Sequence, residues 1–181
     1  GLLAYHAGKT FLPHDAAVGF AMKITGCRFE RNSALEGGAI YAFGKARLTI
    51  SDTVFEENTA RYGGALLDRE GDRTSCTRCT FRRNRAEVDG GAAYADYGTH
   101  QSFVDTLFAD NVAGHEAGAV YVISRASQLE ATQVTIQRGR FTGNQAPAAA
   151  NLVNLDGSVV QLVGTDLPAA TVAGTVTITG G

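Results

Sequence analysis

The chain has 181 residues, 44% of them hydrophobic, and its 16 Lys and Arg against 18 Asp and Glu leave a net charge of −2. This balance excludes the concentrated basic composition that is typical of nucleic-acid-binding proteins, and the hydrophobic content argues against a disordered chain. Its apolar runs fall short of the roughly 18 residues that a transmembrane helix needs, so no direct membrane insertion is predicted.

One motif, Phe-x-x-Asn followed by Gly-Gly-Ala, recurs along the chain. Copies begin at Phe29 ("FERNSALEGGAI"), Phe55 ("FEENTARYGGAL"), Phe81 ("FRRNRAEVDGGAA") and Phe108 ("FADNVAGHEAGAV"), and a weaker copy begins at Phe141 ("FTGNQAPAAANL"). Successive motifs start 26, 26, 27 and 33 residues apart. A near-constant period of this length is typical of a repeat fold.

In chain order, each repeat contains three short strand-like stretches. Residues 21–29 ("AMKITGCRF") and 46–55 ("ARLTISDTVF") alternate apolar and polar residues, and stretches such as 38–43 ("GAIYAF") follow the glycines. Alternation with enrichment in Val, Ile, Thr, Phe and Tyr indicates strands. The pattern predicts an all-β, single-stranded parallel β-helix of about six to seven coils, since leucine-rich repeats need a leucine framework and propeller blades need about 40 residues.

We predict a single β-helix domain over residues 1–181. Residues 1–22 are expected to form a partial N-terminal coil, 23–122 the regular repeats, 123–133 an inserted loop, and 134–181 degenerate C-terminal coils. The first residues, "GLLAY", look like the end of a further repeat, and no signal peptide precedes them. We therefore expect the sequence to be a segment of a longer chain.

Stacked repeats would place equivalent residues in columns, with neighbouring coils about 4.8 Å apart. One column would form an aromatic ladder inside the coil: Phe29, Phe55, Phe81, Phe108 and Phe141. A second would form a ladder of side-chain amides, and Asn also tolerates the left-handed geometry that corners need: Asn32, Asn58, Asn84, Asn111 and Asn144. Glycines would supply positive φ or close backbone approach at a corner: Gly37, Gly38, Gly63, Gly64, Gly90, Gly91 and Gly118.

Two columns of charged residues alternate in sign. They are Arg31, Glu57, Arg83 and Asp110, and Asp52, Arg78, Asp105 and Arg138. Neighbouring strands would bring such residues into contact, and each pair would contribute about 0.2–1 kcal/mol. We interpret both columns as solvated surface that fixes the register of the coils.

The combination of Phe-x-x-Asn with Gly-Gly-Ala-[Ile/Leu/Val] resembles the repeats of the chlamydial polymorphic outer membrane protein family, which also occur in large surface proteins of algae and other protists. The resemblance covers residues 23–122 well and 133–152 weakly. It implies a right-handed parallel β-helix at a cell surface, used for adhesion or as an extended scaffold.

No catalytic, cofactor-binding or metal-binding residue is predicted. Cys76 and Cys79 are interpreted as core residues, with a local disulfide and a metal or redox site as alternatives. The four histidines do not repeat and are interpreted as solvated side chains: His6, His14, His100 and His115. Glu30 and Glu56 share an outward column and form a weak candidate for the paired carboxyls of a glycosidase.

We therefore expect a non-enzymatic structural or adhesive module of a secreted or cell-surface protein, which acts as a rigid scaffold for assembly or surface recognition. Its partners would be other protein chains, including copies of itself, at the open β-helix ends or the outward faces, and surface glycans. Nucleic acid and cofactors are not expected. The alternative is a carbohydrate-active or carbohydrate-binding β-helix protein of the polysaccharide lyase or hydrolase kind.

Overall fold

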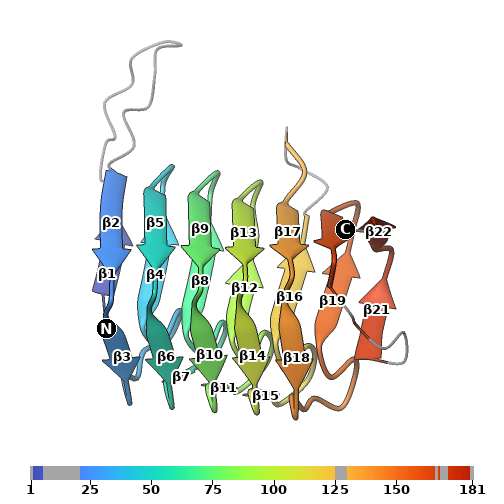
Figure 1. Ribbon diagram of the computed structural model, residues 1–181, viewed down its shortest axis with the longest axis horizontal. Coiled ribbons are helices and arrows are strands. Elements are labelled where there is room, and N and C mark those ends of the chain that lie inside the picture. The colour runs from blue at the N-terminus through green and yellow to red at the C-terminus, as the bar shows by residue number, and fades with distance from the viewer. Residues whose placement is uncertain (1, 6–20, 125–129, 166, 168–170, 180–181) are drawn as a thin grey trace.

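The computed structural model describes residues 2–5, 21–124, 130–165, 167 and 171–179. They form a parallel β-solenoid of about five turns with roughly 26 residues per turn and no helix, which confirms the predicted fold class (Figure 1). Two sheets contain seven strands because strands of incomplete coils extend both ends of the stack, and the expected six to seven coils included these. The right-handed sense of the coil stays a prediction.

Four parallel sheets run along the solenoid, numbered here by their order within one coil. Sheet 1 consists of β2 (Ala21–Thr25), β5 (Arg47–Ser51), β9 (Arg73–Thr77), β13 (His100–Val104), β17 (Gln133–Gln137), β20 (Val159–Val163) and β22 (Thr177–Thr179). Sheet 2 consists of β3 (Arg28–Glu30), β6 (Val54–Glu56), β10 (Thr80–Arg82), β14 (Leu107–Ala109) and β18 (Arg140–Thr142).

The other two sheets complete the coil. Sheet 3 consists of the short strands β7 (Thr59–Ala60), β11 (Arg85–Ala86) and β15 (Val112–Ala113). Sheet 4 consists of β1 (Leu2–Tyr5), β4 (Ile40–Phe43), β8 (Leu66–Arg69), β12 (Ala93–Ala95), β16 (Val120–Ile123), β19 (Leu152–Leu155) and β21 (Val172–Gly174). In Figure 1 the coils follow one another along the long axis in chain order, so each residue lies beside its counterpart one repeat away.

The phenylalanines of the repeat stack inside the solenoid. The ring centroids of Phe55 and Phe81 are 4.5 Å apart with planes 8° from parallel, and those of Phe81 and Phe108 are 5.3 Å apart. Phe29 and Phe141 extend the stack at either end, at 5.2 and 4.9 Å from their neighbours. Aromatic pairs of this kind each contribute about 0.5–1.5 kcal/mol beyond the area that they bury.

The asparagines of the repeat hydrogen-bond from coil to coil. Asn58 Nδ2 donates to Asn84 Oδ1 at 2.9 Å and to the Phe29 carbonyl at 2.9 Å, while Asn58 Oδ1 accepts from the Nδ2 and the backbone N of Asn32. Asn84, Asn111 and Asn144 continue the ladder in the same way, and Asn144 Nδ2 then donates to Asn151 Oδ1 at 3.0 Å. The ladder thus satisfies buried polar groups that apolar side chains would leave unpaired.

The corners turn at residues other than the asparagines. Left-handed φ angles occur at the residue directly before each Asn, for example at Glu57 (φ 54°) and Arg83 (φ 54°), and again in the column of Asp52 (φ 51°) and Arg78 (φ 51°). The expectation that Asn itself occupies the left-handed region at the corner is therefore wrong. The reason is that the Asn side chain must point inward to join the ladder, so the preceding residue makes the turn.

The two glycines of each Gly-Gly pair have different roles. The first has a left-handed φ, as at Gly63 (φ 60°) and Gly90 (φ 69°), and the second allows close contact between coils. A Cβ atom on Gly64 would lie 2.2 Å from the carbonyl oxygen of Gly91, a distance that no side chain can occupy. Gly38, Gly91 and Gly118 are packed equally tightly against the backbone of the next coil.

Parts of the predicted domain organisation fall outside the described residues. These are residues 6–20 of the expected N-terminal coil, 125–129 of the expected inserted loop, and 166, 168–170 and 180–181 near the C-terminus. β1 pairs in register with β4, with Leu2 beside Ile40, as the similarity of "GLLAY" to the end of a repeat indicates. Within the described ranges, no helix has the length and apolar character needed to cross a membrane.

The asparagine ladder generates a stability prediction. Replacement of Asn58 by leucine should lower the free energy of unfolding by about 3 kcal/mol, because the Phe29 carbonyl and the Asn32 amide lose buried partners. Urea unfolding followed by circular dichroism measures this change. Gln145→Leu, at an exposed amide, is the matched control and should change stability by less than about 0.5 kcal/mol. An Asn58→Leu protein as stable as the wild type would show that the ladder does not stabilise the solenoid.

Candidate functional site

The outward face of sheet 1 has a distinctive composition. Its strands alternate between inward, buried side chains and outward, more exposed ones. The seven strands together contain no Asp or Glu, and their only charged or titratable outward residues are Lys23, Arg47, Arg73 and His100. A chain with a net charge of −2 therefore presents one face on which all formal charges are positive.

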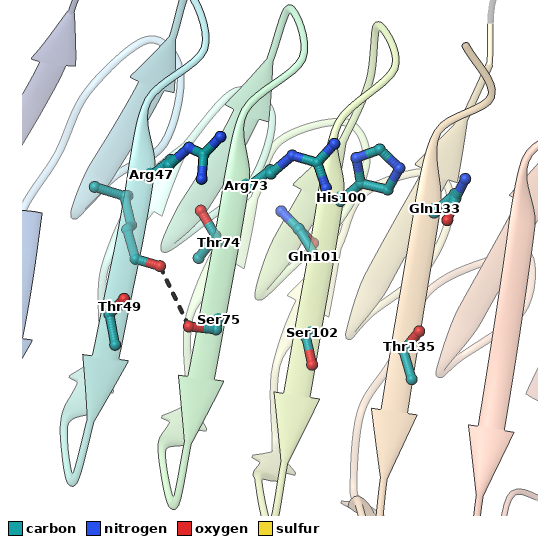
Figure 2. A pocket seen from close by; sticks show the side chains of 11 residues that line it. Arg47, Thr49, Arg73, Thr74, Ser75, His100, Gln101, Ser102, Gln133 and Thr135 are labelled. Atoms are coloured by element: carbon teal, nitrogen blue, oxygen red, sulfur yellow. Dashed lines mark hydrogen bonds between the residues drawn. The ribbon is translucent and has the colours of Figure 1, made fainter. Parts of the chain in front are cut away.

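Two rows of side chains cross this face along the solenoid axis, and Figure 2 shows both. The upper row consists of residues paired directly in register across four neighbouring strands: Arg47, Arg73, His100 and Gln133. The lower row lies two residues further along each strand and consists of hydroxyl-bearing side chains: Thr49, Ser75, Ser102 and Thr135. Since neighbouring strands lie about 4.8 Å apart, both rows form regular arrays of hydrogen-bonding groups.

Arg47 and Arg73 are not neutralised by carboxylates. Both side chains are exposed, and within the described part of the chain neither forms an ion pair. Like charges directly opposite each other on neighbouring strands destabilise a sheet. A sequence selected only for stability would therefore not place two arginines side by side on this face.

The predicted charge columns at the corners show the contrast. Arg78 donates to both carboxylate oxygens of Asp52, at 2.7 and 2.8 Å, and Arg138 does the same to Asp105, at 2.6 and 2.8 Å. These bidentate pairs agree with the interpretation that alternating charges link one coil to the next. The arginine row of sheet 1 lacks this alternation.

A shallow, open hollow of about 340 Å³ lies over β5, β9, β13 and β17, lined by the two rows and by the backbone beneath them. Ser75 Oγ donates to the Leu48 carbonyl at 3.4 Å, which orients one hydroxyl of the lower row. Burial lowers the pKa of His100, Arg73 lowers it further, and Glu130 opposes the shift. His100 is therefore neutral at neutral pH and becomes cationic only under more acidic conditions.

The chemistry of this face is that of anion and hydroxyl recognition. Guanidinium groups offer several hydrogen-bond donors in a fixed planar geometry that matches carboxylate-like anions. Serine and threonine hydroxyls both donate and accept. The residues that line the hollow include no carboxylate and no thiol. The sequence analysis missed this face, because the row has no identity from repeat to repeat, and it assigned His100 only to solvated surface.

The candidate acid pair, Glu30 and Glu56, lies on sheet 2 and is in register between β3 and β6. Glu56 is only 2% exposed, and its carboxylate contacts Arg28, Arg83 and Arg82, the last at 2.7 Å. The hydrogen bond from Arg82 lowers the pKa of Glu56, and the hydrogen bond from Arg28 lowers that of Glu30. A glycosidase acid needs a raised pKa, so this pair does not provide one.

The cysteines are free thiols. Cys76 and Cys79 are both buried, and Cys79 Sγ donates to the Thr77 carbonyl at 3.6 Å, which agrees with core packing. Burial raises the pKa of the Cys76 thiol well above its ordinary value, which keeps it protonated. Cys27 belongs to the same column as Cys79 but is exposed, because it adjoins β3, the edge strand of sheet 2; its assignment to the core is therefore wrong.

A group of polar side chains lies inside the solenoid beneath the arginine row. Asp68 is fully buried, and its Oδ2 accepts a hydrogen bond from Gln101 Nε2 at 3.0 Å. Among the described residues, no hydrogen-bond partner is found for Asp68 Oδ1, Thr74 Oγ1 or Gln101 Oε1. Burial raises the pKa of Asp68 to about 7, and burial together with Asp68 raises that of Asp72 to about 7.

One group of side chains in the described ranges could bring three ligand atoms to a cation. Atoms of Asp89, His115 and Glu116 lie within 4.8 Å of one another. However, Asp89 Oδ1 already bonds to His115 Nδ1 at 3.0 Å and accepts from the backbone N of Glu116 at 3.1 Å. These hydrogen bonds account for the arrangement without a metal. His6 and His14 lie outside the described residues.

In a comparison with protein families, the Chlamydia polymorphic membrane protein repeat matched residues 26–42. This stretch contains Phe29, Asn32 and the first Gly-Gly pair, the motif on which the resemblance rests. Searches of curated proteins and of solved structures returned no match. The short match and the solenoid together suggest a β-helix module of the kind found in surface or outer-membrane proteins.

The buried Asp68 generates a pH prediction. The unfolded carboxyl ionises near pH 4, whereas the folded protein holds this proton up to about pH 7. The folded state therefore binds more protons between these values, and the free energy of unfolding should fall by roughly 4 kcal/mol as the pH rises through this range.

Asp68→Asn removes this titration and should make the protein more stable than the wild type at pH 8, with a shallower dependence between pH 5 and 8. Urea unfolding across this range measures both quantities. Asp52→Asn is the control, because Arg78 lowers the pKa of Asp52 and its titration lies below this range. An unchanged pH dependence in Asp68→Asn would contradict the assignment.

Proposed function

We propose that the chain is a non-enzymatic adhesive module of a secreted or cell-surface protein, in which a rigid solenoid presents the outward face of sheet 1 to a ligand. The observation that carries this proposal is the unneutralised row that begins with Arg47 and Arg73, beside an array of hydroxyls. The match to a repeat of membrane proteins supports the surface setting. Stacked coils joined by backbone ladders keep the two rows at fixed spacing, so the face is organised before it meets a ligand.

The arrangement favours binding over catalysis at this face. The hollow is open and shallow and offers cationic and hydroxyl groups, and its lining lacks the paired carboxyls with different environments that polysaccharide hydrolysis uses. The carboxylates Glu30 and Glu56, on another sheet, are held ionised by arginines. Assembly with other chains through the ends of the solenoid stays a prediction from the sequence.

The test is adhesion of beads coated with the protein to a panel of cell surfaces and extracellular polymers. Wild-type beads should adhere, and a double variant Thr49→Glu and Gln133→Glu, which places carboxylates in both rows, should reduce adhesion by about tenfold through charge repulsion. The matched control, Thr142→Glu with Gln145→Glu, adds the same charge at exposed positions outside sheet 1 and should adhere normally.

Two results would overturn the proposal. Equal adhesion by both double variants would place the binding surface elsewhere, and no adhesion by wild-type beads to any surface would remove the adhesive role. Shortening of the polymers by the wild-type protein, measured by size-exclusion chromatography, would show an enzyme.

A further inference from the structure

The arginine row has a repeat that a ligand must match. Arg47 and Arg73 lie on adjacent strands in direct register, so their backbones are separated by one strand spacing of about 4.8 Å. His100 follows at the next position of the same row. Binding of anionic groups beside the two guanidinium groups would relieve their mutual repulsion. A ligand that carries several anionic groups along an extended chain satisfies this geometry better than a single small anion does.

The second row indicates what lies between those anionic groups. Thr49, Ser75 and Ser102 present hydroxyls in parallel with the arginine row, two residues further along each strand. Gln133 adds a side-chain amide at the end of the upper row. Such groups exchange hydrogen bonds with ligand hydroxyls, which are abundant on sugars. The hollow runs across four strands and is open to solvent, so a chain of several sugar units fits along it.

Other polyanions fit less well. Single-stranded nucleic acids bind to proteins through aromatic side chains on which bases stack, and the hollow contains neither Phe nor Tyr. An acidic peptide would gain main-chain hydrogen bonds only by adding to an open sheet edge, whereas this surface is the face of a sheet whose strands are already paired on both sides. The composition therefore favours a ligand that combines negative charges with many hydroxyls.

We propose that the outward face of sheet 1 binds an extended acidic polysaccharide, whose carboxylate or sulfate groups contact Arg47 and Arg73 while its hydroxyls bond to the row that contains Thr49, Ser75 and Ser102. This inference rests on the proposed function, in which the same face is the adhesive surface, and it names the chemical class of the ligand.

The experiment measures binding of the wild-type protein to dextran sulfate, to polygalacturonate and to neutral dextran by biolayer interferometry. The protein should bind one or both acidic polymers, and this binding should weaken steeply as salt is added. Dextran, which has the backbone of dextran sulfate without its charges, should not bind. Comparison of the two acidic polymers shows whether sulfate or carboxylate is preferred.

The double variant Arg47→Gln with Arg73→Gln should bind the preferred polymer at least about tenfold more weakly, because two charge-assisted contacts are lost. The matched control is Arg85→Gln with Arg140→Gln. It removes the same charge from two exposed arginines that form no ion pair within the described residues and lie on sheets 3 and 2. This control should bind like the wild type, and circular dichroism should show that both variants are folded.

His100 provides a second readout on dextran sulfate, whose charge does not change in this range. The groups that face His100 are Arg73 from β9 and Glu130 from the segment before β17. Binding should tighten as the pH falls from about 7.5 to about 5.5 and His100 gains a proton. His100→Gln should lose this tightening, whereas His115→Gln, at an exposed histidine outside sheet 1, should keep it.

Several outcomes would overturn the inference. These are equal loss of binding in the two arginine variants, equal binding of dextran and dextran sulfate, and binding of oligothymidylate as tight as that of either acidic polysaccharide. If sheet 1 carboxylate variants lose adhesion to cells while no acidic polysaccharide binds, the ligand class is wrong and the adhesive function stands. If adhesion does not depend on sheet 1 at all, both proposals fail.

Discussion

In-register pairing of each coil with the next is the constraint on which the rest of this structure depends. A residue in one coil lies beside its counterpart a full repeat away, so Phe81 stacks on Phe55 and Asn84 bonds to Asn58. A slip of one residue would turn inward side chains outward and break the amide ladder at every coil. The buried asparagines therefore specify the register, and the stacked rings add packing energy once the register is set.

The same constraint turns each outward position into a row along the solenoid. Where charges alternate in sign, as between Asp52 and Arg78, the row neutralises itself and ties neighbouring coils together. Where the sign does not alternate, as between Arg47 and Arg73, the row leaves its charge available to a ligand. The surface of this solenoid thus contains both self-neutralised and unneutralised rows, and the difference lies in one residue choice per repeat.

Departures from an apolar core occur on the strands that carry the arginine row. β9 and β13 present Arg73 and His100 outward, and on the next residue of each strand they place Thr74 and Gln101 inward, near the buried Asp68 of sheet 4. Burial of Asp68 without a cation raises its pKa toward neutrality, because water no longer stabilises the charge. The least regular part of the interior and the candidate recognition surface therefore share two strands.

The amino-acid sequence by itself determined the fold class, the period of about 26 residues and the residues that stack, because a motif repeated at constant spacing is explained only if equivalent residues lie beside one another. It did not locate the left-handed corners, the extension of the amide ladder to Asn151, or the buried Asp68. Arg47 and Arg73 lie 26 residues apart, in segments with no shared motif at those positions. Only the tertiary structure brings them side by side with no carboxylate between them, because the partners of a charge are set by the register of neighbouring coils and not by proximity along the chain.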